Sequence, residues 1–193
     1  HDKSGDGKID VDDLEWSYLE GDGDFNSQEV KNLRDEADII ITNPPFSLFR
    51  DFVAWIVEAK KQFVIIGNMN ALKYKEIFPI IRDKNMWLGA TNFNTGMYFK
   101  VPDEFVHTDT YNFERERNGE KVNRVPGVCW FTTLDHGKRH QPLPLMTEAD
   151  IVKFSTKKPF DVYDNYNAIE VPFVKLIPKD YEGVMGVPIT FLD

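Results

Sequence analysis

The feature that most constrains the fold is a strand that ends abruptly, between residues 38 and 46. Residues 39–41 are three consecutive isoleucines with no polar break, a pattern that predicts a strand buried on both faces, as inside a parallel sheet. Pro44 and Pro45 lack the N–H that a strand ladder needs, and Pro44 favours an extended Asn43. The sequence therefore predicts an Asn side chain at the carboxyl end of a buried strand, the edge where open α/β sheets bind ligands.

The chemistry of Asn43-Pro44-Pro45-Phe46 is specific. The Asn43 side-chain oxygen and a backbone carbonyl held by two prolines offer two hydrogen-bond acceptors, and Phe46 adds a flat face beside them. Such a site fits a planar NH2 group attached to a ring. The alternative interpretation is a plain strand-terminating loop, but the preceding strand and the amphipathic stretch that follows favour a site.

Asn43-Pro44-Pro45-Phe46 resembles the catalytic motif of S-adenosylmethionine-dependent amino-methyltransferases, most closely those that methylate N6 of adenine in DNA. Together with residues 21–27, 38–49 and 65–70, it is similar to the EcoRI-type adenine methylases from about residue 15 onward. The resemblance implies an α/β fold of the Rossmann-like class I methyltransferase type, partial in this chain, with a mostly parallel sheet closed by antiparallel strands. It also implies S-adenosyl-L-methionine as cofactor and double-stranded DNA as partner.

The resemblance assigns roles to individual residues. Asn43, Pro44, Pro45 and Phe46 are the expected catalytic residues, acting on an adenine flipped out of the duplex. Asp24 and Phe25 are expected to bind the adenine of the cofactor, although a plain Asp/Gly turn explains the same residues.

A Gly-rich turn after an apolar strand, which this class needs for its cofactor, is not found in the sequence. We therefore expect a fragment that lacks the N-terminal part of the family, with an incomplete cofactor site and little activity alone.

Hydrophobic periodicity predicts the elements around the motif. Ser27 begins a short helix, Ser47 caps a helix over 48–57, and residues 63–66 form a second strand, giving a right-handed parallel crossover. Asn68 and Asn70 would then reach the same sheet edge as Asn43.

The later part of the chain has a different pattern. It predicts a helix over 70–81 interrupted by Pro79, strands over 86–88, 97–101 and 128–134, and a hairpin that turns at Asn118-Gly119. Trp130 or Phe131 is either a second face for a flipped base or a core aromatic. We predict one partial catalytic domain over 1–193, with an acidic Gly/Asp-rich leading segment over 1–24 and an irregular tail over 150–193 that contains several prolines.

The net charge of −9 looks unfavourable for a protein that binds DNA. Residues 1–38 hold 13 Asp/Glu against 4 Lys/Arg, whereas residues 39–193 hold 19 of each, so the acidity belongs to the N-terminal segment. No strong basic face is visible in the sequence. The best candidates for phosphate contacts are residues 138–140 and 157–158, although small basic clusters are usually solvated surface.

The opening of the chain resembles an EF-hand loop, with oxygen-bearing side chains at Asp2, Ser4, Asp6, Asp10 and Asp13. Asp13 replaces the long Glu that normally gives bidentate coordination, and no second EF-hand motif follows in the sequence. We favour a solvated acidic loop, so no metal is expected in the catalytic site.

Composition limits the class of protein. No stretch reaches the roughly 18 apolar residues of a membrane span, and the single Cys129 excludes an internal disulfide and fits a reducing compartment. We expect a cytoplasmic protein, and the sequence does not indicate its oligomeric state. Two alternatives remain: a protein glutamine N5-methyltransferase, whose motif usually carries Tyr at the position of Phe46, and a calcium-binding or interaction module.

Overall fold

The computed structural model describes residues 3, 5–7, 13–91, 96–107, 115–155 and 159–192. Among them no helix is long and apolar enough to span a membrane. The α-helices are α1 (Gln28–Glu36), α2 (Phe49–Glu58), α3 (Phe78–Arg82) and α4 (Glu148–Phe154). The strands are β1 (Ile39–Thr42), β2 (Gln62–Asn68), β3 (Trp87–Leu88), β4 (Met97–Lys100), β5 (Glu116–Arg117), β6 (Glu120–Val125), β7 (Val128–Thr132), β8 (Asp161–Val162), β9 (Ile169–Glu170) and β10 (Met185–Gly186).

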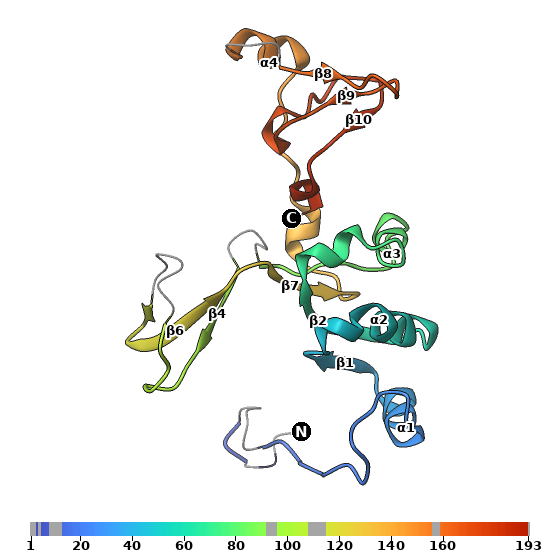
Figure 1. The fold of residues 1–193 in the computed structure, drawn as a ribbon, viewed down its shortest axis with the longest axis vertical. Helices are drawn as coiled ribbons and strands as arrows, with labels where there is room; N and C mark the ends of the chain where they lie inside the picture. Colours follow the sequence, from blue (N-terminus) through green and yellow to red (C-terminus); the bar gives the residue numbers. More distant parts are fainter. Residues whose placement is uncertain are drawn as a thin grey trace.

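The main sheet of the described residues has the strand order β1-β2-β7-β3 (Figure 1). Strands β1 and β2 are parallel, with Ile39 opposite Gln62 and Thr42 opposite Ile65, so the predicted parallel pairing through a helix is confirmed. Strand β7 is antiparallel to both β2 and β3 and lies between them. The fold is therefore mixed α/β, and the prediction of a mostly parallel sheet is wrong because only β1 and β2 form a parallel pair in this sheet.

Helix α2 packs on one face of the sheet and supplies much of the core. The apolar stripe predicted over residues 48–57 is confirmed in part: Phe49, Phe52, Val53 and Ile56 are buried, whereas Leu48 is exposed. The predicted cap is wrong, because Ser47 lies inside a 3₁₀ turn (Phe46–Leu48), and α2 begins after Leu48 without a side-chain cap. The prolines end the strand, and this turn then leads the chain directly into the helix.

Strand β1 is less buried than its sequence predicts. Ile40 packs against the core, but 72% of Ile41 is exposed, and Ile39 is exposed as well. Among the described residues β1 pairs with β2 alone, so it is an edge strand. An isoleucine run predicts burial on both faces only where neighbouring elements cover both faces.

The segment from 69 to 82 is not one helix. It contains a 3₁₀ helix (Met69–Lys73) followed by α3, and Pro79 lies in the first turn of α3 rather than interrupting a longer helix. A proline fits there because the first-turn N–H groups have no intrahelical acceptor. The predicted strand over 86–88 is confirmed as β3.

Strands β4, β6 and β5 form a separate three-stranded sheet that projects away from the main sheet (Figure 1). We call this sheet the arm. The predicted turn is confirmed, because Asn118 and Gly119 both have positive φ, 52° and 77°, between β5 and β6. The strand predicted over 97–101 is confirmed as β4, but it pairs with β6 of the arm and does not join the main sheet.

The C-terminal segment lies beyond the main sheet at the top of Figure 1. Where the sequence predicts an irregular tail, the described residues include α4 and the small sheet β10-β9-β8. These elements enclose a second apolar cluster around Ile151, Phe160, Ile169, Val171 and Ile177. Two-residue strands are too short for a periodic pattern to reveal them.

Gly67 allows α2 to pack closely on the sheet. A Cβ atom at this position would lie 2.4 Å from Phe49 Cε2 and 2.8 Å from Phe131 Cε2. We expect Gly67→Ala to lower the free energy of unfolding by about 1–3 kcal/mol, because buried rings cannot move aside freely. Gly137→Ala is the control, since a Cβ there meets nothing within 4 Å. Equal denaturant midpoints for the two variants would contradict this packing.

Candidate cofactor and catalytic site

One cavity of about 610 Å³ brings together the two predicted sets of site residues. Asp24 and Phe25 line it, and so do Asn43, Pro44 and Pro45, which lie at the end of β1. Its volume is within the range of small-molecule sites, roughly 300–1,000 Å³. The other lining residues are Asp22, Gly23, Val30, Leu33, Arg34, Ala37, Ile39, Ile40, Thr42, Leu48, Phe52 and Trp55.

Aromatic rings form a wall of this cavity. The Phe25 ring lies edge-on to Phe52 at 5.4 Å and to Trp55 at 5.6 Å between centroids. Arg34 of α1 lies over the Trp55 ring at 4.7 Å and donates to the Trp55 carbonyl oxygen at 3.1 Å. The Trp55 Nε1–H is buried without a hydrogen-bond partner in the described structure. The cavity therefore combines this apolar wall with the carboxylate of Asp24 and with an unsatisfied hydrogen-bond donor, the Trp55 Nε1–H. This combination suits a nucleoside.

The loop that carries Asp24 is fixed by the helix that follows it. Glu29 accepts hydrogen bonds from the backbone N–H of Glu20 at 2.8 Å and of Gly21 at 3.0 Å. Ser27 caps α1 by accepting from Val30 N–H, so the predicted helix start is confirmed. Asp24 Oδ1 accepts from Asn26 N–H at 2.9 Å. Asp24 thus forms the expected turn and also lines the cavity.

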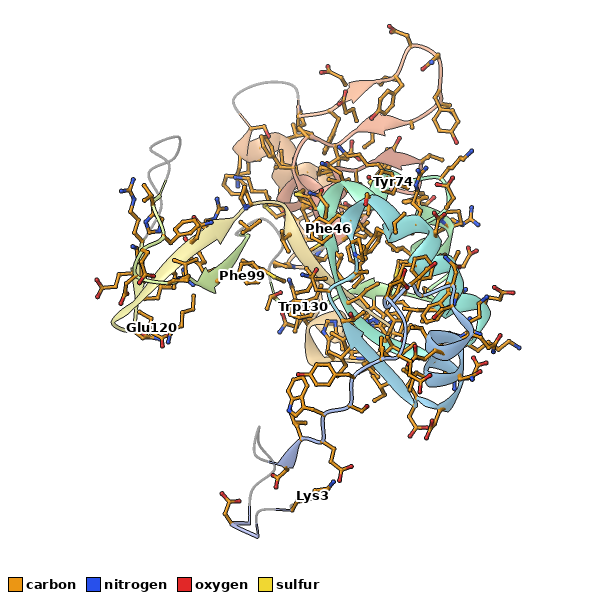
Figure 2. The ribbon with its side chains drawn as sticks, turned by 60° about the horizontal axis from the view of Figure 1, so that its bottom comes forward. Lys3, Phe46, Tyr74, Phe99, Glu120 and Trp130 are labelled. Atoms are coloured by element: carbon orange, nitrogen blue, oxygen red, sulfur yellow. The ribbon has the colours of Figure 1, made fainter. Side chains whose placement is uncertain are left out.

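The four motif residues have different environments. Asn43 is exposed within the cavity lining, and Pro44 beside it is buried. Phe46, labelled in Figure 2, begins the 3₁₀ turn, is 40% exposed and is not among the residues that line the cavity. An exposed ring next to the cavity is available to stack on a substrate.

The other candidates at this edge have structural roles. Asn68 caps the 3₁₀ helix by accepting from Asn70 N–H at 2.8 Å. Phe131 is fully buried against Phe49, which excludes it as a face for a base. Trp130 lies on the opposite face of the sheet, opposite Ile66, and lines a different hollow with Val64. Neither aromatic lines the cavity of Asn43.

The calcium loop falls mainly outside the described residues, because Asp2, Ser4 and Asp10 are not described. Asp13 is buried and accepts from the backbone N–H of Lys3 at 2.7 Å. Asp6 lies at the exposed surface. Over the part of the chain that is described, no cluster of three or more His, Cys, Asp or Glu residues is arranged to hold a metal. Cys129 is buried and forms no disulfide.

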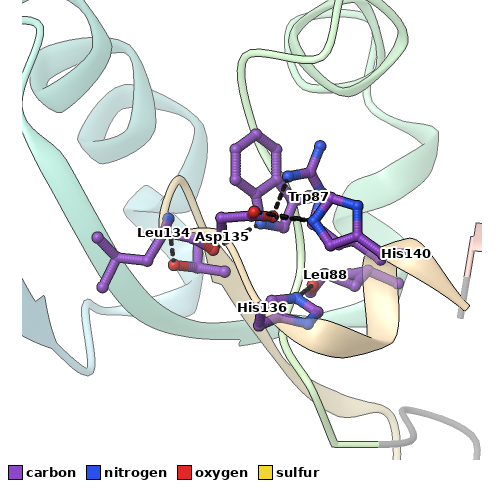
Figure 3. A network of polar contacts seen from close by, with 8 residues as sticks. Trp87, Leu88, Leu134, Asp135, His136 and His140 are labelled. Carbon is purple, nitrogen blue, oxygen red and sulfur yellow. Dashed lines mark hydrogen bonds and ion pairs between the residues drawn. The ribbon is translucent and has the colours of Figure 1, made fainter.

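Residues 134–140 form a network of polar contacts within the protein (Figure 3). This segment includes residues 138–140, which the sequence predicts to contact phosphates. Arg139 donates to Asp135 at 2.6 Å and lies over the Trp87 ring at 3.5 Å. The Nε2 atom of His140 lies 2.8 Å from Asp135 Oδ2. Arg139 and His140, two of the three residues predicted to contact phosphates, therefore already have a carboxylate partner within the protein, Asp135. The other candidates, Lys157 and Lys158, lie outside the described residues.

This network predicts a shifted titration. Hydrogen bonds from His140, and secondly from Arg139, hold the pKa of the Asp135 carboxyl below its ordinary value. Folding lowers the pKa of Asp135, so its ionised form stabilises the folded protein. This stabilisation is fully present above the unfolded pKa of about 3.9, and it is lost as the pH falls through the folded pKa. In carbon-detected NMR titrations, we expect His140→Ala to raise the Asp135 midpoint. Asp83, which Arg82 holds low, is the internal control and should not move.

Comparison with known proteins identifies the family. The family model described as adenine-specific methyltransferase EcoRI matches residues 1–193. The class of protein is therefore a methyltransferase, and the chain belongs to the EcoRI family of adenine-specific methyltransferases. The resemblance inferred from the Asn43 motif is confirmed.

Individual relatives agree with this assignment. The chain is 41% identical over 187 residues to the type II methyltransferase M.EcoRI of Escherichia coli, covering 96% of this chain and 55% of that protein. It is 41% identical over 177 residues to the type II methyltransferase M.MpnI of Mycoplasma pneumoniae, covering 91% and 54%. M.MgeORF184P of Mycoplasma genitalium is 38% identical over 177 residues, with the same coverage. The chain thus spans about half the length of these curated relatives.

Proposed function

We propose that the protein transfers a methyl group from S-adenosylmethionine to N6 of an adenine in double-stranded DNA, as the modification enzyme of a restriction-modification system. The observation that carries the proposal is the single cavity lined by Asp24 and Phe25 together with Asn43, Pro44 and Pro45. Family membership supports the reaction class, and the names of the relatives, type II methyltransferases, support the restriction-modification setting.

Asp24 and Phe25 hold the cofactor in this proposal. The Asp24 carboxylate accepts from the exocyclic amino group of the cofactor adenine, and the Phe25 ring, fixed by Phe52 and Trp55, packs against the base. When bound there, S-adenosylmethionine supplies a methyl group activated by its sulfonium sulfur.

Asn43, Pro44 and Phe46 act on the target base. The adenine leaves the duplex because its N6 is otherwise paired and stacked. Phe46 stacks on the flipped base, while the Asn43 side-chain oxygen and the Pro44 carbonyl oxygen accept the two N6 hydrogens. These bonds draw the nitrogen lone pair out of the ring and orient it toward the methyl group. Pro45 keeps the turn rigid.

The proposal is tested by expressing the full-length protein in a bacterial host without adenine methylation. We expect modification-sensitive sequencing of the host DNA to find N6-methyladenine within one short recurring sequence, because the family is adenine-specific. That sequence would be the recognition site. Absence of N6-methyladenine, with the soluble protein present, would overturn the proposal.

A further inference from the structure

In the described part of the chain, the α-helices beside the main sheet all lie on one side of it. Helices α1, α2 and α3 lie on the same side of β1 and β2 (Figure 1). Phe63, Ile65 and Phe131 point to that side and are fully buried with residues of α2. Side chains alternate between the two faces along a strand, so the residues between these three point to the opposite face. We call the opposite face the open face, which carries Ile39, Ile41, Val64, Ile66 and Trp130.

The open face is apolar and only partly covered. Residues 134–140 cover the β3 end of this side of the sheet. Nearer to β1, 72% of Ile41 is exposed, and it lies opposite Val64, which is not buried either. Ile66 and Trp130 lie opposite each other and are also not buried. No charged residue occurs in β1, β2 or β7, so this surface lacks the charges that protect an exposed sheet from association.

The segment before α1 also exposes large side chains. Residues 14–19 belong to no helix or strand, and Trp16 is 83% exposed while Tyr18 is fully exposed. Parallel strands are normally buried on both faces, and a contiguous exposed apolar surface marks a contact surface. Both regions therefore indicate that a further element covers this part of the molecule.

The lengths of the relatives indicate what this element is. The matched region covers 55% of M.EcoRI and 54% of M.MpnI, so nearly half of each relative lies outside it. An element of the same polypeptide is tethered to the sheet, so it packs there without the loss of translational freedom that binding a second molecule requires. A segment of the full-length protein is therefore favoured over a second copy or a separate partner.

We propose that a segment of the full-length protein outside residues 1–193 packs on the open face and buries Ile41, Ile66 and Trp130. This inference rests on the exposed sheet and on the length of the relatives, and it does not depend on the reaction proposed above. The open face and the candidate site share β1, because Ile39 lies on the open face and also lines the cavity. The covering segment therefore lies beside the cavity that Asn43 lines.

The test measures thiol labelling in the full-length protein. Ile41→Cys and Ile66→Cys each place a thiol on the open face, and Val152→Cys is the control because Val152 is 54% exposed in α4, outside the main sheet. A maleimide is added under native conditions, and mass spectrometry of the peptides gives the labelling rate at each position. Each rate is divided by the rate of the same variant in denaturant, which removes differences in intrinsic thiol reactivity. Circular dichroism shows whether each variant is folded, and Val64→Cys replaces a variant that is not.

Ile41→Cys and Ile66→Cys should react at least about 100-fold more slowly than Val152→Cys, because a covered thiol reacts only when the structure opens locally. This protection should persist on dilution to concentrations at which light scattering finds a monomer. Labelling of Ile41→Cys at the control rate in the folded protein would overturn the inference. Protection that disappears on dilution would also overturn it, because the cover would then be a second copy. Methyl transfer, measured on the same samples, tests the proposed function separately.

Discussion

Asn43→Ala is expected to reduce methyl transfer by at least about 100-fold, the usual cost of removing a group that stabilises a transition state. In the proposed mechanism the Asn43 oxygen accepts one of the two N6 hydrogens, so its loss leaves the nitrogen lone pair conjugated with the ring. Cofactor affinity should change little, because the residues proposed to hold the cofactor adenine, Asp24 and Phe25, are intact. Single-turnover transfer and equilibrium binding of the cofactor measure the two quantities separately.

Two further variants sharpen this test. Asn43→Asp keeps an acceptor oxygen and should retain more transfer than Asn43→Ala. Asn85→Ala removes an exposed Asn side chain outside the cavity lining and should behave as the wild type. Turnover by Asn43→Ala within a few-fold of that of Asn85→Ala would remove Asn43 from the catalytic group.

Asp24→Ala is expected to weaken cofactor binding by about 10- to 100-fold, because a hydrogen bond to a charged group contributes about 1.5–3 kcal/mol. The rate of transfer at saturating cofactor should fall less, since Asp24 does not touch the transferred group in the proposed mechanism. Isothermal titration with the cofactor and transfer kinetics at several cofactor concentrations give both values.

The turn made by Asp24 requires a control, because its Oδ1 atom accepts from Asn26 N–H. Asp24→Asn keeps an acceptor for that turn while removing the charge, so it separates the turn from cofactor binding. Glu36→Ala removes an exposed carboxylate at the end of α1 and should leave affinity unchanged. Cofactor affinity equal to that of the wild type in both Asp24 variants would contradict the assignment.

The sequence predicted the part of the fold that depends on local patterns. The isoleucines before Asn43, the stripe of α2 and the Asn118-Gly119 turn each produced the expected element because a few neighbouring residues determine it. Strand partners and burial depend on distant segments. For that reason the insertion of β7 between β2 and β3 and the exposure of Ile41 were missed.

Sequence patterns indicated residues of the candidate site but not how these residues are arranged in space. The Asp24 loop and the Asn43 motif each have a local signature, whereas the shared cavity depends on how α1 and α2 pack, through contacts such as Arg34 with Trp55.

The central claim is methyl transfer to adenine N6 by the group around Asn43. The most direct measurement incubates the full-length protein with labelled S-adenosylmethionine, duplex DNA and protein acceptors, and then digests the products and identifies the labelled residue. We predict label in N6-methyladenine, and its loss in Asn43→Ala. Label in glutamine of the protein acceptor would instead assign the motif to a protein methyltransferase and contradict the account.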